Sequence, residues 1–291
     1  RGAGLRDYGP GTGGGGPAVV FIPSLINPPY VLDLAAQNSL LRWLAARGHR
    51  VLLLDWGEDV AARGELSIAG HVEEIMLPLL AGHEGAALAG YCLGGTMALA
   101  AAGHLRCRAV ATIAAPWHFS GYEDAARGEV ARLWQAARPA AETLGLLPME
   151  ILQSGFWALD PARTVRKYAR FAELEPESEA ARAFIALEDW ANEGPPLPAA
   201  AARELFETLF GGDLPGRGAW RIAGGTADPA RLACAQLHLV ATGDRIVPAA
   251  SAPRTGERLE TDAGHVGMVV GSRARKQLWE PLDTWLQALC D

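Results

Sequence analysis

Residues 90–95 read Gly-Tyr-Cys-Leu-Gly-Gly, and this hexapeptide constrains the fold more than any other part of the chain. It has the pattern of a nucleophile elbow, G-x-nucleophile-x-G, with Cys92 as the nucleophile. A short apolar stretch at 85–89 precedes it, and residues 96–102, which are rich in helix formers, follow it. The pattern predicts a buried strand that turns sharply into a helix, with Cys92 at the bend. The competing interpretation is a buried structural cysteine between small residues.

The neighbours of Cys92 fit such a turn. Gly90 and Gly94 have no side chains, so a strand and a helix can approach each other closely there. The amide of Leu93 would lie at a helix N-terminus, where it can stabilise both a thiolate and the oxyanion of a tetrahedral intermediate. We therefore expect Leu93 to supply one donor of an oxyanion hole.

Strands and helices alternate through the first part of the chain. Apolar runs predict strands at 18–23, 50–56 and 109–115. Helical spacing of apolar residues predicts helices at 31–47 and at 67–80, the second with Ser67 as a possible N-cap. This alternation is typical of a mostly parallel sheet with right-handed crossovers and helices on both of its faces.

The pattern changes between residues 117 and 231, which are mostly helical in periodicity. Strands return at 236–242 and 258–260, and an amphipathic helix is expected at 272–289. We therefore predict three regions: a flexible N-terminal segment at 1–16, an α/β core at 17–116 and 232–291, and a large helical cap insertion at 117–231. The cap would cover the carboxyl edge of the sheet.

Several function classes are disfavoured by composition. The 291 residues carry a formal charge of -7, so neither nucleic acid nor an anionic membrane is an expected partner. The four cysteines are far apart in the sequence and form no C-x-x-C, which argues against a disulfide framework or a zinc site and fits a reducing compartment. No signal peptide is visible, so we expect a cytoplasmic protein. The glycines at 11–16 match G-x-G-x-x-G, but they precede the first strand and are expected to form a linker.

Two further residues complete a catalytic constellation. Asp244 directly follows the strand at 236–242, and His265 comes 21 residues later, ahead of the terminal helix. The order nucleophile, acid, histidine is that of an α/β-hydrolase fold. We therefore predict a triad of Cys92, Asp244 and His265. Asp55 also ends a strand, but it precedes the nucleophile and is expected to be structural.

The chemistry follows from these side chains. His265 would act as base toward the Cys92 thiol, and Asp244 would orient and support the imidazole. The second oxyanion donor is expected from the loop after the first strand, as the amide of Leu25 or Ile26. A cysteine nucleophile suits a thioester substrate and favours passing the acyl group onward. No cofactor or metal is expected.

The same residues resemble the polyhydroxyalkanoate synthases. The catalytic box of that family, G-x-C-x-G-G, is met by residues 90–95, and its D-W-G by residues 55–57. Further segments similar to family motifs are I-N-P-P-Y-V-L-D-L at 26–34, A-P-W-H-F-S at 115–120, D-R-I-V-P at 244–248 and G-H-V-G at 264–267. The resemblance covers most of the sheet domain, with the motifs in the family's order. Arg245 stands where the family often has histidine, and the insertion is only loosely similar to the family cap.

The resemblance implies an acyltransferase that uses 3-hydroxyacyl-coenzyme A and makes a polyester. Cys92 would carry the acyl chain as a thioester, His265 would activate the thiol, and Asp244 would help activate the incoming 3-hydroxyl group. A homodimer and contact with a polyester granule are further expectations. Two alternatives stay open: a thioesterase or esterase on the same fold, and a non-catalytic granule or partner-binding homologue. For a catalyst, we expect the cap to roof the pocket and to bury Cys92.

Overall fold

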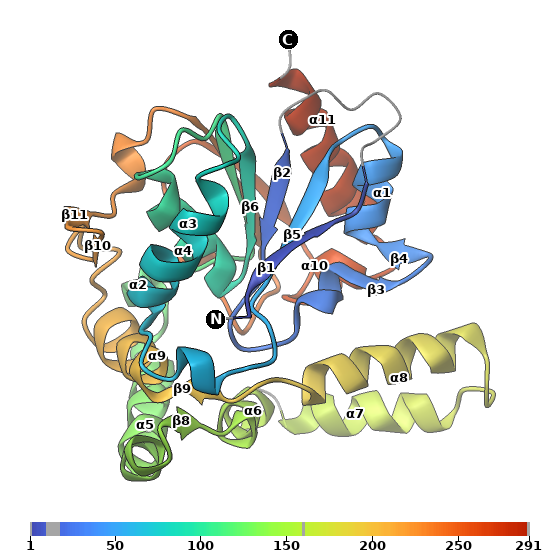
Figure 1. The fold of residues 1–291 in the computed structure, drawn as a ribbon. Coiled ribbons are helices and arrows are strands. Elements are labelled where there is room, and N and C mark those ends of the chain that lie inside the picture. The colour runs from blue at the N-terminus through green and yellow to red at the C-terminus, as the bar shows by residue number, and fades with distance from the viewer. Residues whose placement is uncertain (1, 10–17, 159–160, 290–291) are drawn as a thin grey trace.

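The computed structural model describes residues 2–9, 18–158 and 161–289, and its centre is a seven-stranded sheet (Figure 1). The strands lie in the order β1 (Gly4–Asp7), β5 (Val51–Asp55), β2 (Val19–Ile22), β6 (Ala87–Tyr91), β7 (Ala109–Ile113), β12 (Ala235–Ala241) and β13 (Glu257–Thr261). All neighbours pair in parallel except β1, which runs antiparallel to β5. The predicted mostly parallel sheet is confirmed.

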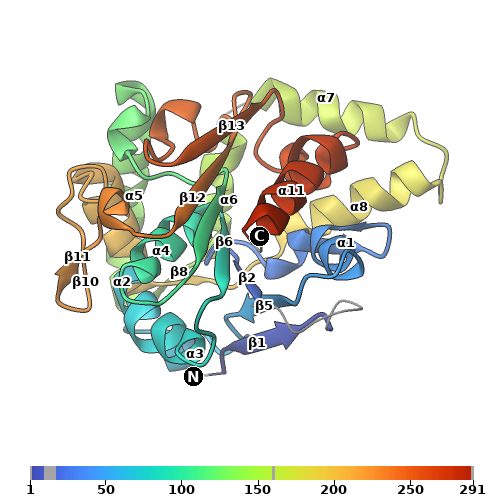
Figure 2. The ribbon, with the colours of Figure 1, turned by 90° about the horizontal axis from the view of Figure 1, so that it is seen from above.

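Helices cover both faces of this sheet (Figure 2). One face packs against α1 (Leu40–Ala46), η8 (Arg275–Trp279) and α11 (Glu280–Ala288). The other packs against α2 (Ile68–His71), η3 (Val72–Met76), α3 (Leu77–Leu80) and α4 (Leu93–Ala102). Along β2, Val19 and Phe21 belong to the first cluster and Val20 and Ile22 to the second. Burial on both sides explains why these strands are continuously apolar.

The helix predicted at 31–47 is only partly correct. A 3₁₀ turn, η1 (Pro29–Leu32), and a short hairpin of β3 (Asp33–Ala35) and β4 (Asn38–Ser39) come first, and α1 begins at Leu40. The side chain of Ser39 accepts a hydrogen bond from the Arg42 amide at 3.0 Å, as an N-cap does. The helix therefore begins only at Leu40, because the cap residue Ser39 fixes where it starts.

The N-terminal segment 1–16 was expected to be flexible, and for residues 4–7 this is wrong. They form β1, with Gly4 opposite Asp55 and Asp7 opposite Leu52, and Arg6 Nε donates to Asp55 Oδ2 at 2.6 Å. An edge strand needs no apolar run, because one of its sides faces solvent. The predicted linker at 11–16 lies outside the described residues.

The insertion between β7 and β12 is mostly helical, as expected. Its elements are η4 (Phe119–Gly121), α5 (Asp124–Leu144), β8 (Leu146–Leu147), α6 (Met149–Ala158), α7 (Pro161–Ala172), α8 (Glu179–Asn192), β9 (Leu197–Pro198), α9 (Ala199–Arg203), η5 (Glu204–Gly211), β10 (Arg221–Ile222), β11 (Gly225–Thr226) and η6 (Pro229–Arg231). In Figure 1, α7 and α8 form a long hairpin on the side of the sheet where α6 also lies. The remaining short helices are η2 (Ala61–Arg63), η7 (Ala249–Ser251) and α10 (Gly267–Val270).

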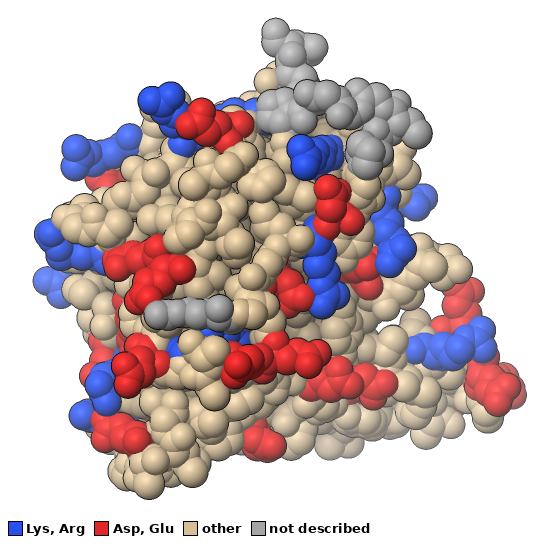
Figure 3. Space-filling view, in the orientation of Figure 1, with Lys and Arg blue, Asp and Glu red and all other residues tan. Residues whose placement is uncertain are grey.

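Acidic side chains and the long uncharged stretch of the chain lie in different parts of the fold. On the face shown in Figure 3, acidic side chains gather in a band across the cap side. The uncharged stretch at 85–103 is divided between β6 and α4, both of which are buried. Within the described ranges, none of the helices combines the length and the apolarity that a bilayer crossing requires.

Candidate active site

Cys92 occupies the turn between β6 and α4, as the hexapeptide predicts. Its backbone has φ 55° and ψ -131°, a combination that L-residues rarely adopt. Two backbone hydrogen bonds hold it there: the Cys92 amide donates to the Ile113 carbonyl and the Gly95 amide donates to the Cys92 carbonyl, both at 2.9 Å. The strained backbone therefore fixes the direction in which the sulfur points.

The three glycines around Cys92 are required by close backbone contacts. A Cβ atom added to Gly90 would overlap the backbone of Gly94 and Gly95, and one added to Gly95 would overlap the side chain of Ala115. A Cβ atom on Gly94 would overlap the carbonyl groups at the end of β2. Glycine therefore brings the elbow against the loop from which the second oxyanion donor is expected.

Asp244 and His265 form a buried, directly bonded pair. His265 Nδ1 and Asp244 Oδ2 are 2.6 Å apart, and the two side chains are 8% and 1% exposed. The other carboxylate oxygen, Oδ1, accepts hydrogen bonds from the amides of Ile246 at 2.8 Å and Val247 at 2.9 Å. The loop after β12 therefore fixes the carboxylate, and the carboxylate fixes the Nδ1 side of the imidazole ring.

His265 also interacts with the Cys92 sulfur. Burial disfavours the charged imidazolium, but the negative charge of Asp244 and of Cys92, together with hydrogen bonds to both side chains, outweighs burial and raises the pKa of His265 to about 10. Because Asp244 bonds Nδ1, the nitrogen left for the sulfur is Nε2. The structure thus brings Cys92, His265 and Asp244 together, and their catalytic roles stay a prediction.

The three candidate oxyanion donors differ in their surroundings. Leu93 is the first residue of α4, so its amide lies at a helix N-terminus next to the sulfur. The Ile26 amide already donates to the Ser24 hydroxyl at 3.2 Å, whereas Leu25 is buried in the same loop. Ile26 lines the cavity and Leu25 does not, whereas the Ile26 amide is engaged by Ser24, so both amides stay candidates for the second donor.

Cys92 faces a cavity of about 260 Å³ that lies between the sheet edge and the cap. From the core it is lined by Pro23, Ser24, Ile26, Asn27, Pro28, Val31, Tyr91, Asp244, Arg245, Ile246, His265 and Val266. From the cap it is lined by Gln153, Phe156, Trp157, Thr164, Lys167, Leu187, Glu188, Trp190 and Ala191. The cap therefore does roof the nucleophile. The expectation that Cys92 is fully buried is wrong, because the cavity reaches the sulfur and leaves it partly exposed.

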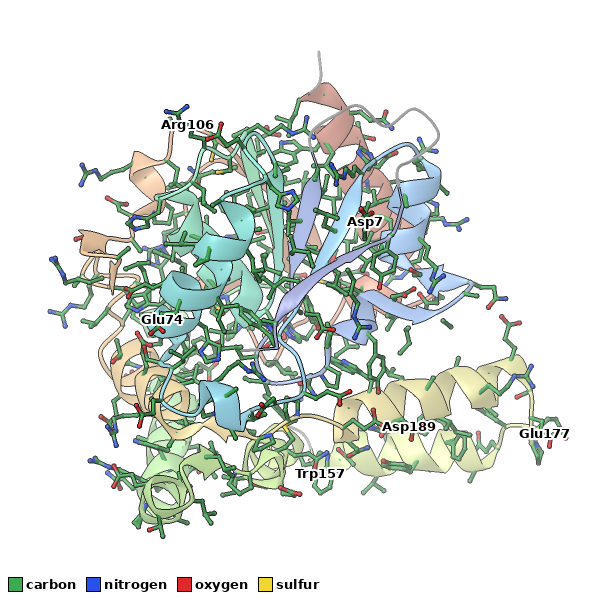
Figure 4. The ribbon with its side chains drawn as sticks, in the orientation of Figure 1. Asp7, Glu74, Arg106, Trp157, Glu177 and Asp189 are labelled. Atoms are coloured by element: carbon green, nitrogen blue, oxygen red, sulfur yellow. The ribbon has the colours of Figure 1, made fainter. Side chains whose placement is uncertain are left out.

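The roof is made by α6, α7 and α8. Trp157, which lines the cavity from α6, lies on the cap side of the sheet in Figure 4. Inside the roof, Lys167 Nζ lies 2.7 Å from both carboxylate oxygens of Glu188 and joins α7 to α8. Two bonds fasten α8 to the loop after β2: Trp190 Nε1 donates to the Pro28 carbonyl at 2.8 Å, and the Tyr30 hydroxyl donates to Glu193 at 2.7 Å.

Tyr91 is a site residue that the motif contained but did not identify. Its ring centroid lies 5.1 Å from that of His265, and its hydroxyl donates to the His265 carbonyl at 3.4 Å. Burial, with the charges of Cys92 and Asp244, raises the pKa of Tyr91 well above its usual value. Tyr91 therefore stays a neutral phenol that supports the imidazole ring. Its position beside Cys92 in the elbow was the available signal.

Asp55, which was expected to be structural, and the buried His238 both lie outside the cavity lining. Asp55 pairs with Arg6 and accepts from the Gly57 amide at 2.9 Å, away from the cavity. His238 lies between the hydroxyls of Thr112 at 2.8 Å and Thr255 at 3.4 Å, and burial lowers its pKa to about 4. The contacts of Asp55 agree with the structural role expected for it, and those of His238 give this histidine a structural role as well.

Comparison with known proteins places the chain in a family. It belongs to the alpha/beta hydrolase family, whose sequence profile matches residues 15–278. It is 28% identical over 289 residues to the poly(3-hydroxyalkanoate) polymerase subunit PhaC of Haloferax mediterranei, which covers 92% of this chain and 58% of that protein. It is 25% identical over 288 residues to the subunit of the same name from Thiocystis violacea, and this match covers 92% of this chain and 80% of that protein.

Solved structures share the fold. A thermophilic esterase from Thermogutta terrifontis superposes with a TM-score of 0.59 at 17% identity, covering 99% of this chain and 93% of the esterase. A monoacylglycerol lipase from Paleococcus ferrophilus superposes with a TM-score of 0.60 at 15% identity, covering 99% of this chain and 100% of the lipase. The chain is thus an alpha/beta hydrolase that is similar in sequence to poly(3-hydroxyalkanoate) polymerase subunits and spans 58% of the length of the Haloferax relative.

Proposed function

We propose that this protein is an acyltransferase of the polyhydroxyalkanoate synthase type, with Cys92, His265 and Asp244 as its triad. The observation that carries the proposal is a cysteine at a strained elbow, hydrogen-bonded to a histidine that is itself bonded to a buried aspartate, inside a cavity roofed by the cap. The sequence identity of 28% and 25% to two poly(3-hydroxyalkanoate) polymerase subunits supports 3-hydroxyacyl-coenzyme A as the acyl donor.

In the first half-reaction, His265 already carries a proton, because its pKa is raised to about 10, and the Cys92 sulfur beside it attacks the thioester carbonyl as a thiolate. The amide of Leu93, together with that of Leu25 or Ile26, stabilises the oxyanion that forms. The bond to the coenzyme A sulfur then breaks, and His265 gives its proton to that leaving thiolate. The acyl group stays on Cys92 as a thioester, so one thioester has replaced another at little energetic cost.

In the second half-reaction, an acceptor hydroxyl enters the cavity. His265, which is neutral after the first half-reaction, takes its proton, the oxygen attacks the acyl-Cys92 carbonyl, and an ester forms as the Cys92 sulfur leaves beside the protonated His265. Asp244 holds Nδ1 of His265 in both steps, so that Nε2 is always the nitrogen that moves the proton. The apolar cavity walls from Ile26, Phe156 and Leu187 would accept the acyl chain.

The decisive experiment is incubation of the purified protein with 3-hydroxybutyryl-coenzyme A, following free coenzyme A and insoluble polymer together. Release of coenzyme A with polymer formation is expected, and Cys92→Ala should show neither. Coenzyme A release without polymer would establish the second candidate, a thioesterase or esterase. The fold likeness to esterases favours that candidate among the alternatives.

Contact with a polyester surface or a second copy is part of the same proposal. Among the described residues, seven large apolar side chains are exposed, and five of them lie on the cap between α6 and α8: Trp157, Val165, Tyr168, Leu174 and Ile185.

The acyl substrate requires no cofactor in this mechanism. We also propose a cytoplasmic location, since the described cysteines are free thiols that suit a reducing compartment.

A further inference from the structure

Two cysteines that are distant in the sequence are neighbours in the fold. Cys107 and Cys234 are separated by 127 positions, yet their Sγ atoms are 3.6 Å apart. Both are free thiols and both are partly exposed. The mechanism proposed above uses neither of them, so their juxtaposition calls for a separate explanation.

The topology explains why they meet. Cys107 lies just before β7 and Cys234 directly before β12, and these strands pair in parallel with Ala109 opposite Ala235. Both thiols therefore sit at the amino ends of neighbouring strands, whereas Cys92 follows the carboxyl end of β6. In Figure 4, Arg106, the neighbour of Cys107, lies at the end of the molecule away from Trp157 and the cap.

We propose that Cys107 and Cys234 form a modification site: a dithiol that a small-molecule disulfide, such as glutathione disulfide, oxidises to an intramolecular disulfide. In the register that pairs Ala109 with Ala235, Cys107 and Cys234 are offset by one position, and their side chains meet diagonally across the two strands with the Sγ atoms 3.6 Å apart. Side-chain rotation has to bring the sulfurs from 3.6 Å to a bond length of about 2 Å.

The two thiols differ in reactivity. The Cys107 thiol donates a hydrogen bond to the Cys234 sulfur, which lowers the pKa of Cys234 and, with burial, raises that of Cys107. The thiol with the lower pKa has more of the attacking thiolate. Cys234 is therefore the thiol that reacts first, and Cys107 resolves.

The chemistry balances in two exchanges. The Cys234 thiolate attacks one sulfur of glutathione disulfide, forming a mixed disulfide and releasing one glutathione thiolate. Cys107 then loses its proton and attacks the Cys234 sulfur, forming the protein disulfide and releasing the second glutathione. The two protein thiols are oxidised, the glutathione disulfide is reduced, and the two thiol protons end on the two glutathiones.

The cross-link would close a loop that contains the whole insertion. Because the bond joins the strand ends on either side of residues 117–231, it restrains the unfolded chain over a long segment and stabilises the fold. We expect the melting temperature to rise by about 5–10 °C on oxidation. Since the bond lies at the opposite edge of the sheet, acylation of Cys92 should be unchanged.

The test uses the full chain with glutathione disulfide at mildly alkaline pH, in a Cys92→Ala background. Remaining thiols are alkylated, the protein is digested, and peptides are identified by mass spectrometry before and after reduction. The expected product is a Cys107–Cys234 peptide pair lighter by two hydrogens than the reduced pair, with the rise in melting temperature. In Cys107→Ser, Cys234 should instead accumulate as a glutathione mixed disulfide.

Three outcomes would overturn the proposal: both cysteines left as alkylated thiols, each carrying its own glutathione without a cross-link, or a disulfide joining either of them to Cys290. The cross-link is read on the oxidised Cys92→Ala protein itself, so the main result does not depend on whether Cys107→Ser folds. Because Cys92 is absent from this background, failure here leaves the acyltransferase proposal untouched.

Discussion

The core side and the cap side of the cavity are built differently. On the core side, Asp244 and His265 are 1% and 8% exposed, joined at 2.6 Å, and Asp244 is anchored by two backbone amides. On the cap side, the Lys167–Glu188 pair is 36% and 13% exposed, and Trp157 is 53% exposed. The core thus fixes the reacting groups, whereas the cap supplies side chains that can adjust to what is bound.

This difference separates two questions about function. The reaction type depends on Cys92, His265 and Asp244, whose positions are fixed by the sheet and by the loops that follow its strands. The choice of acyl chain and acceptor depends on helices that touch the core through few polar bonds, such as the one from Trp190 to Pro28. Substitutions on the core side should therefore lower the rate for every substrate, and those on the cap side should change preference among substrates.

The largest effect is expected for Cys92→Ala. Without the sulfur no acyl-enzyme forms, so coenzyme A release should fall by about 10⁴-fold or more. Labelling by a radioactive acyl thioester, followed by denaturing electrophoresis, measures the intermediate directly. Cys107→Ser is the matched control and should label normally. A variant without Cys92 that still labels would show that the nucleophile lies elsewhere.

Asp244→Asn should come next. It keeps the volume of the side chain but removes the charge that holds the imidazole, and we expect kcat/KM to fall by roughly 10³-fold for all acyl donors alike. Steady-state kinetics with two chain lengths tests both the size and the uniformity of the loss. Asp55→Asn, at a strand end away from the cavity, should lose far less activity. A loss confined to one chain length would contradict the division between core and cap.

The raised pKa of His265 makes the core side pH-dependent. Between pH 6.5 and about 10 the folded protein holds a proton on His265 that the unfolded chain has released, so stability must fall as pH rises through this range. This contribution is complete below pH 6.5 and lost above pH 10. The slope should reach about 1 kcal/mol per pH unit. Urea unfolding of the wild type and of His265→Gln measures it, and equal slopes in the two proteins would refute the assignment.

The smallest effect is expected on the cap side. Phe156→Ala would remove an aromatic wall of the cavity, so KM for longer acyl donors should change by about tenfold while kcat for a short donor stays nearly constant. Kinetics with a series of 3-hydroxyacyl-coenzyme A donors tests this. Phe184→Ala serves as the control, because its ring stacks on Phe171 and does not line the cavity. An equal loss of kcat for every donor would place Phe156 with the core residues.

The sequence was most informative where local motifs carry the chemistry. The elbow around Cys92 depends on glycines whose need is local, and the positions of Asp244 and His265 depend on which strand or loop each one follows. For these residues, chain order and element type were sufficient to predict that they would meet. The edge strand at residues 4–7 was missed, because its pairing with β5 depends on backbone groups that leave no apolar pattern.

What the sequence by itself determined is the α/β architecture and which residues form the candidate triad, because apolar periodicity and glycine spacing encode strands, helices and turns directly. What only the tertiary structure decided involves contacts between distant segments. These are the cap residues that reach the cavity, the use of the Ile26 amide by Ser24, the partial exposure of Cys92 and the approach of Cys107 to Cys234. Such contacts depend on how whole elements pack against one another, and the position of a residue along the chain does not determine which distant side chain will lie beside it.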